Sequence, residues 1–131
     1  MKMNPVVHFE MPTKDKKRVA DFYSKVFGWK MQQMGAEMGD YVLAQTAETD
    51  AQGMVQTPGT INGGFFEFKD EPGFNSPHVV ISVEDINKSI ADVKAAGGQV
   101  NGEIMDIPGI GKYVSFTDSE DNTVGILQPT R

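Results

Sequence analysis

The sequence contains no cysteine and only two histidines, so few residue types are available for chemistry. Without cysteine the chain has no disulfide framework, no thiolate metal site and no thiol nucleophile. Twelve basic against eighteen acidic residues give a formal net charge of −6, which repels nucleic-acid phosphates and anionic membrane surfaces. The chain shows no signal-peptide pattern and no apolar run near the roughly 18 residues of a membrane span. We therefore expect a cytoplasmic protein that binds neither nucleic acid nor membranes.

A repeated unit organises the chain: an apolar strand, a helix closed by glycine, and then short strands. His8 and His78 open equivalent strands 70 residues apart, and Val19 and Ile90 occupy equivalent helix positions 71 residues apart. A length of 131 residues is typical of one domain. The pattern predicts an α+β fold of two βαβββ modules within a single domain covering residues 1–131. The modules run from about 5 to 69 and from 78 to 131, with a linker at about 70–77.

Hydrophobic periodicity and turn residues locate the elements of each module. Gly28 is placed to end the first helix in the left-handed conformation, and Gly97 and Gly98 close the second. We expect the first module to contain strands at 6–11, 29–34, 41–46 and 61–68 and a helix at about 14–27. For the second module we expect strands at 78–83, 99–107, 112–117 and 123–128 and a helix starting at 84 or 85.

Strand parity separates the two faces of the first strand. Side chains alternate along a strand, so Val6, His8 and Glu10 point to one face, and the residues between them point to the other. The face without ionisable groups should pack on the following helix. His8 and Glu10 are therefore expected to face any concavity of the sheet.

Four segments resemble the vicinal oxygen chelate superfamily, which contains glyoxalases, bleomycin-resistance proteins and extradiol dioxygenases. They are His8–Glu10, Asp21–Trp29, His78–Val83 and Ser115–Gly125. The resemblance implies that each module forms a curved sheet and that the two sheets make a cup with the helices outside. It also implies a homodimer. Metal-dependent members bind a divalent metal through ligands on the first and last strands of each module.

The resemblance places the first-strand metal ligands at His8 and His78. The acidic position of the final strand falls on Gly125, which has no side chain. In the first module the equivalent position is either Glu67 or one of the glycines at 63 and 64. With Glu67, three ligands would be available for zinc, nickel, iron or manganese. Glu10 is the alternative third ligand, and Glu10 and Glu67 are the candidate catalytic bases.

Several residues are candidates for contact with a small molecule. Gly63 and Gly64 either open the floor of the cup or form a β-bulge. Phe66 offers an aromatic face for stacking, and Tyr113 and Ser115 place hydroxyl groups on one face of a strand.

These observations favour a protein that binds a small organic molecule in the cup, with a degenerate metal site and no cofactor. We favour the binding protein over a metal enzyme because Gly125 stands at the metal-ligand position of the final strand and supplies no ligand atom. The alternative is a metal-dependent glyoxalase-type lyase or extradiol-type dioxygenase that uses His8 and His78. A purely structural module would instead have a cup filled by its own side chains.

Overall fold

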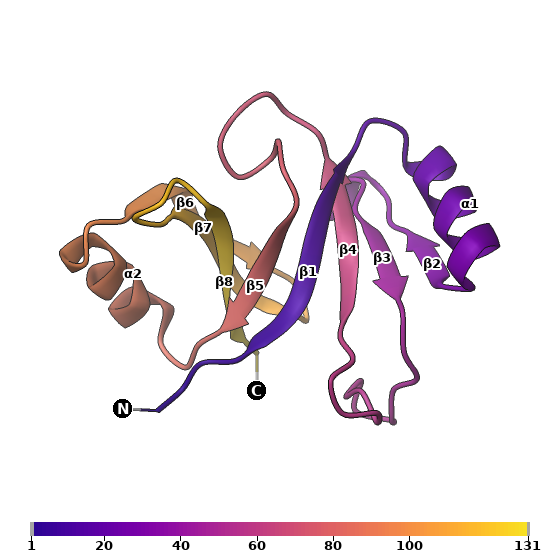
Figure 1. The fold of residues 1–131 in the computed structure, drawn as a ribbon, viewed down its shortest axis with the longest axis horizontal. Helices are drawn as coiled ribbons and strands as arrows, with labels where there is room; N and C mark the ends of the chain where they lie inside the picture. Colours follow the sequence, from indigo (N-terminus) through magenta and orange to yellow (C-terminus); the bar gives the residue numbers. More distant parts are fainter. Residues whose placement is uncertain (1, 131) are drawn as a thin grey trace.

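Eight strands form one continuous sheet in the order β2-β3-β4-β1-β5-β8-β7-β6 in the computed structural model, which describes residues 2–130 (Figure 1). The first half contains β1 (Val6–Thr13), α1 (Lys16–Phe27), β2 (Lys30–Gln33), the 3₁₀ helix η1 (Ala36–Met38), β3 (Val42–Gln45) and β4 (Asn62–Glu67). The second half contains β5 (His78–Ser82), α2 (Ile86–Ala95), β6 (Gln99–Ile107), β7 (Gly111–Thr117) and β8 (Thr123–Pro129). The predicted α+β fold of two βαβββ units is confirmed.

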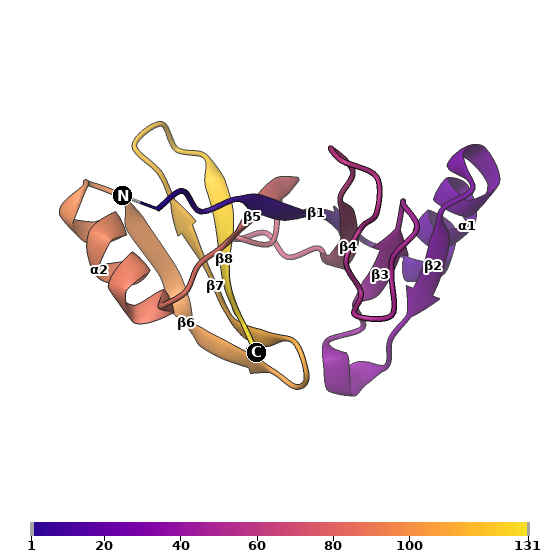
Figure 2. The ribbon, with the colours of Figure 1, turned by 90° about the horizontal axis from the view of Figure 1, so that it is seen from below.

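The first strands of the two halves lie side by side at the centre of the sheet. β1 pairs antiparallel with β5, which places His8 opposite Val80 and Glu10 opposite His78. β1 also pairs in parallel with β4, and β5 pairs in parallel with β8. The sheet curves on both sides of this central pair, with α1 and α2 at opposite outer ends, so the two halves face each other (Figure 2).

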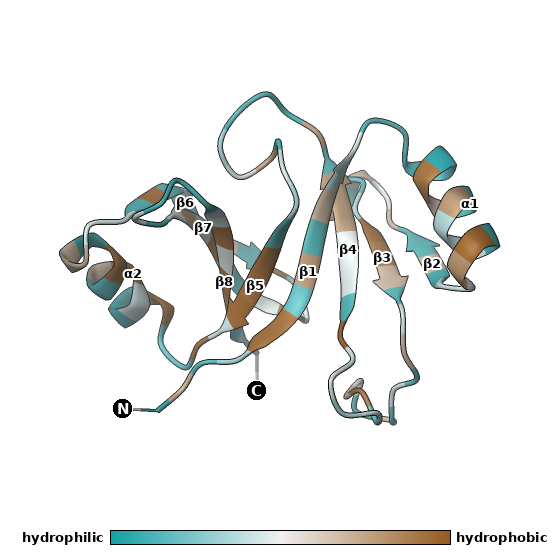
Figure 3. Cartoon of the chain, viewed as in Figure 1, coloured by the Kyte–Doolittle hydropathy of each residue, from teal (hydrophilic) through white to brown (hydrophobic). Residues whose placement is uncertain are grey.

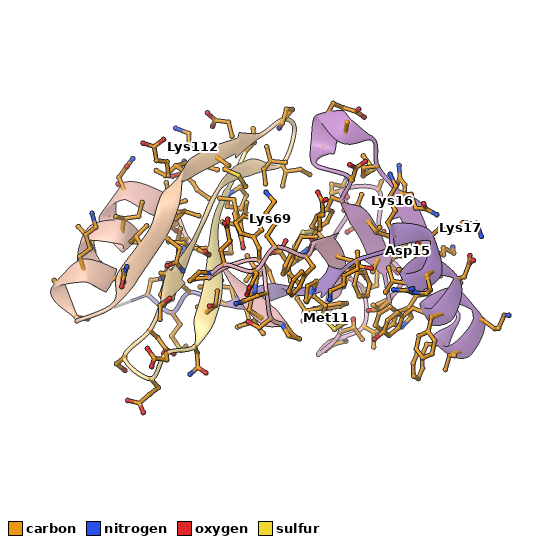
Figure 4. The ribbon with its side chains drawn as sticks, turned by 90° about the horizontal axis from the view of Figure 1, so that it is seen from above. Met11, Asp15, Lys16, Lys17, Lys69 and Lys112 are labelled. Atoms are coloured by element: carbon orange, nitrogen blue, oxygen red, sulfur yellow. The ribbon has the colours of Figure 1, made fainter. Side chains whose placement is uncertain are left out.

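Local chemistry sets the ends of the helices. Asp15 precedes α1 with an extended backbone, and its side chain accepts a hydrogen bond from the backbone N–H of Arg18. This cap explains why α1 begins at Lys16 rather than at the predicted residue 14. Gly28 ends the helix with φ of 72°, as predicted. Figure 4 shows Asp15, Lys16 and Lys17 together at this end of α1.

Each half has its own apolar core between its helix and its part of the sheet. Figure 3 marks the hydrophobic residues of the helices and strands in brown. In the first half, Phe9 and Met11 of β1 pack against a buried cluster formed by Ala20, Val42, Ala44 and Phe65. The second core is centred on Val83, Ile86, Val114 and Ile126. Since Phe9 and Met11 face the core, His8 and Glu10 lie on the opposite, concave face, as strand parity predicts.

No helix within residues 2–130 is long and apolar enough to cross a membrane.

Candidate functional site

A buried carboxylate, that of Glu10, connects the two halves on the concave face. Its Oε2 accepts a hydrogen bond from the Tyr41 hydroxyl at 2.8 Å, and its Oε1 accepts one from the Tyr113 hydroxyl at 2.8 Å. Nε2 of His78 lies 2.9 Å from the same Oε1. The side chain of Glu10 is only 12% exposed. Donors from β5, β7 and the residue preceding β3 thus converge on a side chain of β1.

Two glycines make room for the tyrosine rings. Gly64 is the register partner of Glu10 on β4, and Gly125 is the partner of Val80 on β8. A Cβ at Gly64 would collide with the ring of Tyr41, and a Cβ at Gly125 would lie 2.6 Å from the Tyr113 hydroxyl. In each half, a tyrosine therefore occupies the space that a side chain on the last strand would need.

Glu67 lies away from the histidines. It pairs with Thr13, three residues from the pairing of Glu10 with Gly64, so its side chain belongs to the opposite face of the sheet. The same register shows that Gly64, rather than Gly63 or Glu67, is the counterpart of Gly125. Glu10 is thus the carboxylate that the structure brings to the histidines.

The donor set does not fit the divalent metal site of the metal-dependent relatives. Gly64 and Gly125 supply no ligand atoms, and the Nε2 atom of His78 already faces Glu10. Within the described residues, no group of three or more His, Cys, Asp or Glu side chains is arranged to hold a metal ion.

The protonation states around Glu10 follow from its surroundings. Burial acts to raise the pKa of Glu10, but hydrogen bonds from His78, Tyr113 and Tyr41 outweigh it, and the pKa is lowered overall. Glu10 is therefore ionised at neutral pH. Burial, together with the charge of Glu10, raises the pKa of both tyrosines far above the usual value. Both phenols therefore stay protonated and donate hydrogen bonds to the carboxylate.

His78 is enclosed by the protein. Its side chain has no exposed area, and its Nε2 faces both Glu10 at 2.9 Å and the Tyr113 hydroxyl at 3.2 Å. Its Nδ1 lies 3.2 Å from the carbonyl oxygen of Ser76. The ring stacks on Phe66 with 5.4 Å between centroids. Both ring nitrogens are thus engaged within the protein.

His8 is engaged on one side only. Its Nε2 lies 2.9 Å from the Tyr41 hydroxyl. Burial lowers the pKa of His8, against the opposite effect of the negative charge of Glu10. The ring is therefore uncharged at neutral pH.

A cavity of about 290 Å³ lies beside His8 in the first half. It is bordered by strands β1 to β4 and by the loop between β3 and β4. Its lining includes His8, Lys30, Gln32, Leu43, Gln45 and Asn62. This volume is near the lower end of the range for small-molecule sites, about 300–1,000 Å³. A larger hollow of about 480 Å³ lies at the β6–β7 turn, and its lining includes neither Glu10 nor any of the side chains that bond to it.

The residues expected to contact a ligand are placed in different surroundings. Gly63 lines the cavity. Gly64 lies beneath Tyr41, and Phe66 is buried against His78. Tyr113 binds Glu10, and Ser115 is buried and accepts a hydrogen bond from Asn101 at 3.4 Å. Ligand contact by these residues stays a prediction.

Tyr41 is the residue of the site that sequence reasoning missed. It precedes Tyr113 by 72 residues, close to the repeat spacing that relates the two histidines. That spacing, together with a glycine at the same place on each last strand, is the signal that could have identified it.

Known proteins with related sequences and structures match nearly the whole chain. The sequence model of the Glyoxalase/Bleomycin resistance protein/Dioxygenase superfamily matches residues 6–126. A putative glyoxylase of Mycobacterium tuberculosis is 28% identical over 110 residues, and the alignment covers 82% of this chain but only 38% of that protein. A lactoylglutathione lyase of Haemophilus influenzae is 26% identical over 117 residues, with 88% and 85% of the two chains covered.

Among solved structures, a methylmalonyl-CoA epimerase of Streptomyces coelicolor superposes with a TM-score of 0.70 at 13% identity. The superposition covers 99% of this chain and 100% of the epimerase. At this identity the likeness establishes a common fold.

Proposed function

Because the chain belongs to the glyoxalase/bleomycin resistance protein/dioxygenase superfamily, we propose that it binds a small organic molecule in the cavity beside His8, without a metal between its two histidines. One observation carries this proposal. Tyr41 and Tyr113 occupy the space above Gly64 and Gly125 and donate to Glu10, so the centre of the cup is closed by the protein's own side chains. The open space lies to one side of that centre.

The composition of the cavity supports the same function. Leu43 contributes apolar surface, whereas Lys30, Gln32 and Asn62 contribute polar groups. Small-molecule sites commonly combine an apolar wall with a few polar groups that fix the orientation of the ligand. The volume of about 290 Å³ favours a small ligand over a long cofactor.

The second candidate is a metal-dependent lyase or dioxygenase. His8, Glu10 and His78 lie on one face of two adjacent strands, which favours this alternative. For a metal to bind there, Tyr41 would have to leave its position between His8 and Glu10. Tyr113 would also have to move away from the carboxylate.

Metal analysis distinguishes the two candidates. Protein incubated with excess zinc or nickel and then dialysed should retain less than one equivalent of metal by elemental analysis. A tight stoichiometric metal that is lost in a His8→Ala, His78→Ala double variant would overturn the metal-free proposal.

Ligand binding is tested by a fragment screen that monitors the amide NMR signals of the cavity. Fragments should perturb residues around His8 and Asn62. The variant Leu43→Trp should block binding because it fills the cavity. Met105→Trp is the matched control, since Met105 is also a partly exposed strand residue but lies on β6. Absence of any perturbation at the cavity, or equal binding by Leu43→Trp, would contradict the proposal.

We also propose that the chain forms a homodimer. Val7 and Val79 on the two central strands are each 39% exposed, and Phe22, Val26 and Phe27 of α1 are more than half exposed. Exposed apolar surface of this kind is typical of protein contacts. Sedimentation velocity should give the mass of two chains, and a monomer at every concentration would contradict this.

A further inference from the structure

We infer that Glu10 and Tyr41 hold His8 in one tautomer, and that the free Nδ1 of His8 is a fixed hydrogen-bond acceptor for the ligand. This inference rests on the proposed function, because it concerns the ligand of the same cavity. In this arrangement Tyr41 and Glu10 are positioning residues, and His8 makes the contact with the ligand.

The ionised carboxylate of Glu10 determines which groups donate and which accept in the hydrogen bonds that link Glu10, Tyr41 and His8. An ionised carboxylate only accepts hydrogen bonds, and a phenol has a single proton to donate. Tyr41 uses that proton in the hydrogen bond that its hydroxyl donates to Oε2 of Glu10 at 2.8 Å. Its oxygen can then only accept in its contact with Nε2 of His8 at 2.9 Å. Nε2 of His8 must therefore carry the hydrogen.

The other ring nitrogen follows by elimination. An imidazole that is uncharged and protonated at Nε2 has a bare lone pair at Nδ1. No side chain or backbone group in the described part of the chain forms a hydrogen bond with Nδ1 of His8. Over the same residues, every fully buried side-chain nitrogen or oxygen has a partner. Nδ1 is therefore accessible, and the open space that the ring lines is the cavity.

His78 shows that this arrangement is specific to the first half. Its Nε2 also faces a tyrosine and Glu10, but its Nδ1 lies 3.2 Å from the Ser76 carbonyl oxygen. The ring is fully enclosed, so no ligand can reach it. Of the two histidines, His8 is thus the one with a nitrogen available to a ligand.

Two other side chains of the cavity lining, Asn62 and Lys30, can donate hydrogen bonds to a ligand. Oδ1 of Asn62 accepts from the backbone N–H groups of Thr46 at 2.8 Å and Ala47 at 3.1 Å, which leaves its Nδ2 to donate. Lys30 adds an ammonium group to the same lining. A matching ligand carries a hydroxyl or N–H group that donates to His8 and an oxygen acceptor for Asn62 or Lys30.

The tautomer is measured without any ligand. Long-range ¹H–¹⁵N NMR spectra of the whole protein labelled with ¹⁵N-histidine distinguish protonation at Nε2 from protonation at Nδ1. We expect His8 to be protonated only at Nε2 at neutral pH. Tyr41→Phe should give a mixture of tautomers at His8. Tyr113→Phe is the matched control, because it removes a donor to the same carboxylate without touching His8.

Two outcomes of this measurement would overturn the inference. One is protonation of His8 at Nδ1 in the wild-type protein, which needs no variant to be observed. The other is an equal change at His8 in Tyr41→Phe and Tyr113→Phe, because a general loosening of the site would have that effect.

Ligand preference is tested with matched fragment pairs such as 4-hydroxybenzamide and 4-methoxybenzamide. The hydroxyl member should bind about tenfold more tightly, as expected when a partly buried acceptor loses its donor. Pairs that bind at the cavity without this preference would overturn the inference and leave the proposed function standing. Failure of the whole fragment series to reach the cavity would instead overturn the proposed function.

Discussion

The two halves of the sheet have the same strand plan but surround their histidines differently. His78 of the second half is enclosed, with its ring stacked on Phe66 of β4 and its Nδ1 near the Ser76 carbonyl oxygen. In the first half, His8 borders an open cavity. The contrast shows that a duplicated fold can keep one copy of a residue as part of its structure and leave the other available for binding.

A single non-equivalent position explains much of this difference. Glu10 pairs with Gly64 on the last strand of the first half, and Val80 pairs with Gly125 on the last strand of the second. Glu10 and Val80 therefore occupy equivalent positions. Only the first half has a carboxylate there. That carboxylate bonds directly to His78 of the second half, but it reaches His8 of its own half only through Tyr41.

The connecting segments add to the contrast. The linker between the halves packs on the concave face of the second half, where a Cβ at Gly73 would lie 2.7 Å from the Ser115 hydroxyl. The loop between β3 and β4 instead borders the cavity, to which it contributes Thr49 and Gly53. The linker thus covers part of the second half of the cup, while the loop between β3 and β4 forms part of a cavity wall in the first half.

Removing the carboxylate should give the largest effect, because it joins the two halves. Glu10→Ala would leave the partners of Glu10 in the second half, His78 and Tyr113, without their acceptor. Each buried hydrogen-bonding group left without its partner typically costs about 1–3 kcal/mol, so the two together should cost about 2–6 kcal/mol. We expect a loss of that size in the free energy of unfolding, measured by urea denaturation.

The control for this change is Glu67→Ala, which removes an exposed carboxylate from β4. Exposed substitutions of this kind usually change stability by less than about 0.5 kcal/mol. Similar losses in the two variants would contradict the central role of Glu10.

Filling the space above the glycines should give the next largest effect. Gly64→Ala and Gly125→Ala each place a methyl group against a tyrosine ring, and the contact is closer at Gly64. Overpacking typically costs about 1–3 kcal/mol. Thermal unfolding should therefore show both variants destabilised, Gly64→Ala more than Gly125→Ala. The reverse order would indicate that the first half adapts more easily than the second.

The sequence was sufficient to predict the face on which the main site residues lie. Alternation along β1 separates His8 and Glu10 from Phe9 and Met11, and the structure has this arrangement. The same rule places Gln128 on the helix side of β8, where its side chain accepts from the backbone N–H of Ile86 at 2.9 Å. A period of two residues is a local property, so these predictions needed no tertiary information.

Register and distance could not be predicted in the same way. Whether Gly63, Gly64 or Glu67 matches Gly125 depends on the pairing of β4 with β1, which joins residues more than 50 positions apart. His8 and Glu10 are two residues apart on the same strand, about 6.6 Å, so from the sequence Glu10 looks too distant for one group to contact both side chains. The Tyr41 hydroxyl spans that gap, and no local pattern indicates that its ring crosses to β1.

Acidification should lower the free energy of unfolding in two stages, the first linked to His8 and the second to Glu10. The folded-state pKa of His8 is lowered from its ordinary value of 6.5, so the unfolded chain binds protons first and stability falls as the pH drops below 6.5. The pKa of Glu10 is lowered from 4.5, which adds a second loss below pH 4.5. His8→Gln should remove the first stage and Glu10→Gln the second, as measured by urea unfolding across this pH range. A rise in stability on acidification would contradict both assignments.

The caps of the two helices should give the smallest effect and test whether the halves also differ away from the site. Asp15 accepts one backbone hydrogen bond at the start of α1, whereas Asp85 accepts two at the start of α2. Loss of a helix cap typically costs about 1 kcal/mol. Asp85→Ala should therefore lower the free energy of unfolding slightly more than Asp15→Ala. Neither should alter the His8 tautomer, because each cap lies on the helix side of the sheet. A change at His8 in the Asp15→Ala spectrum would show that the position of α1 affects the cavity.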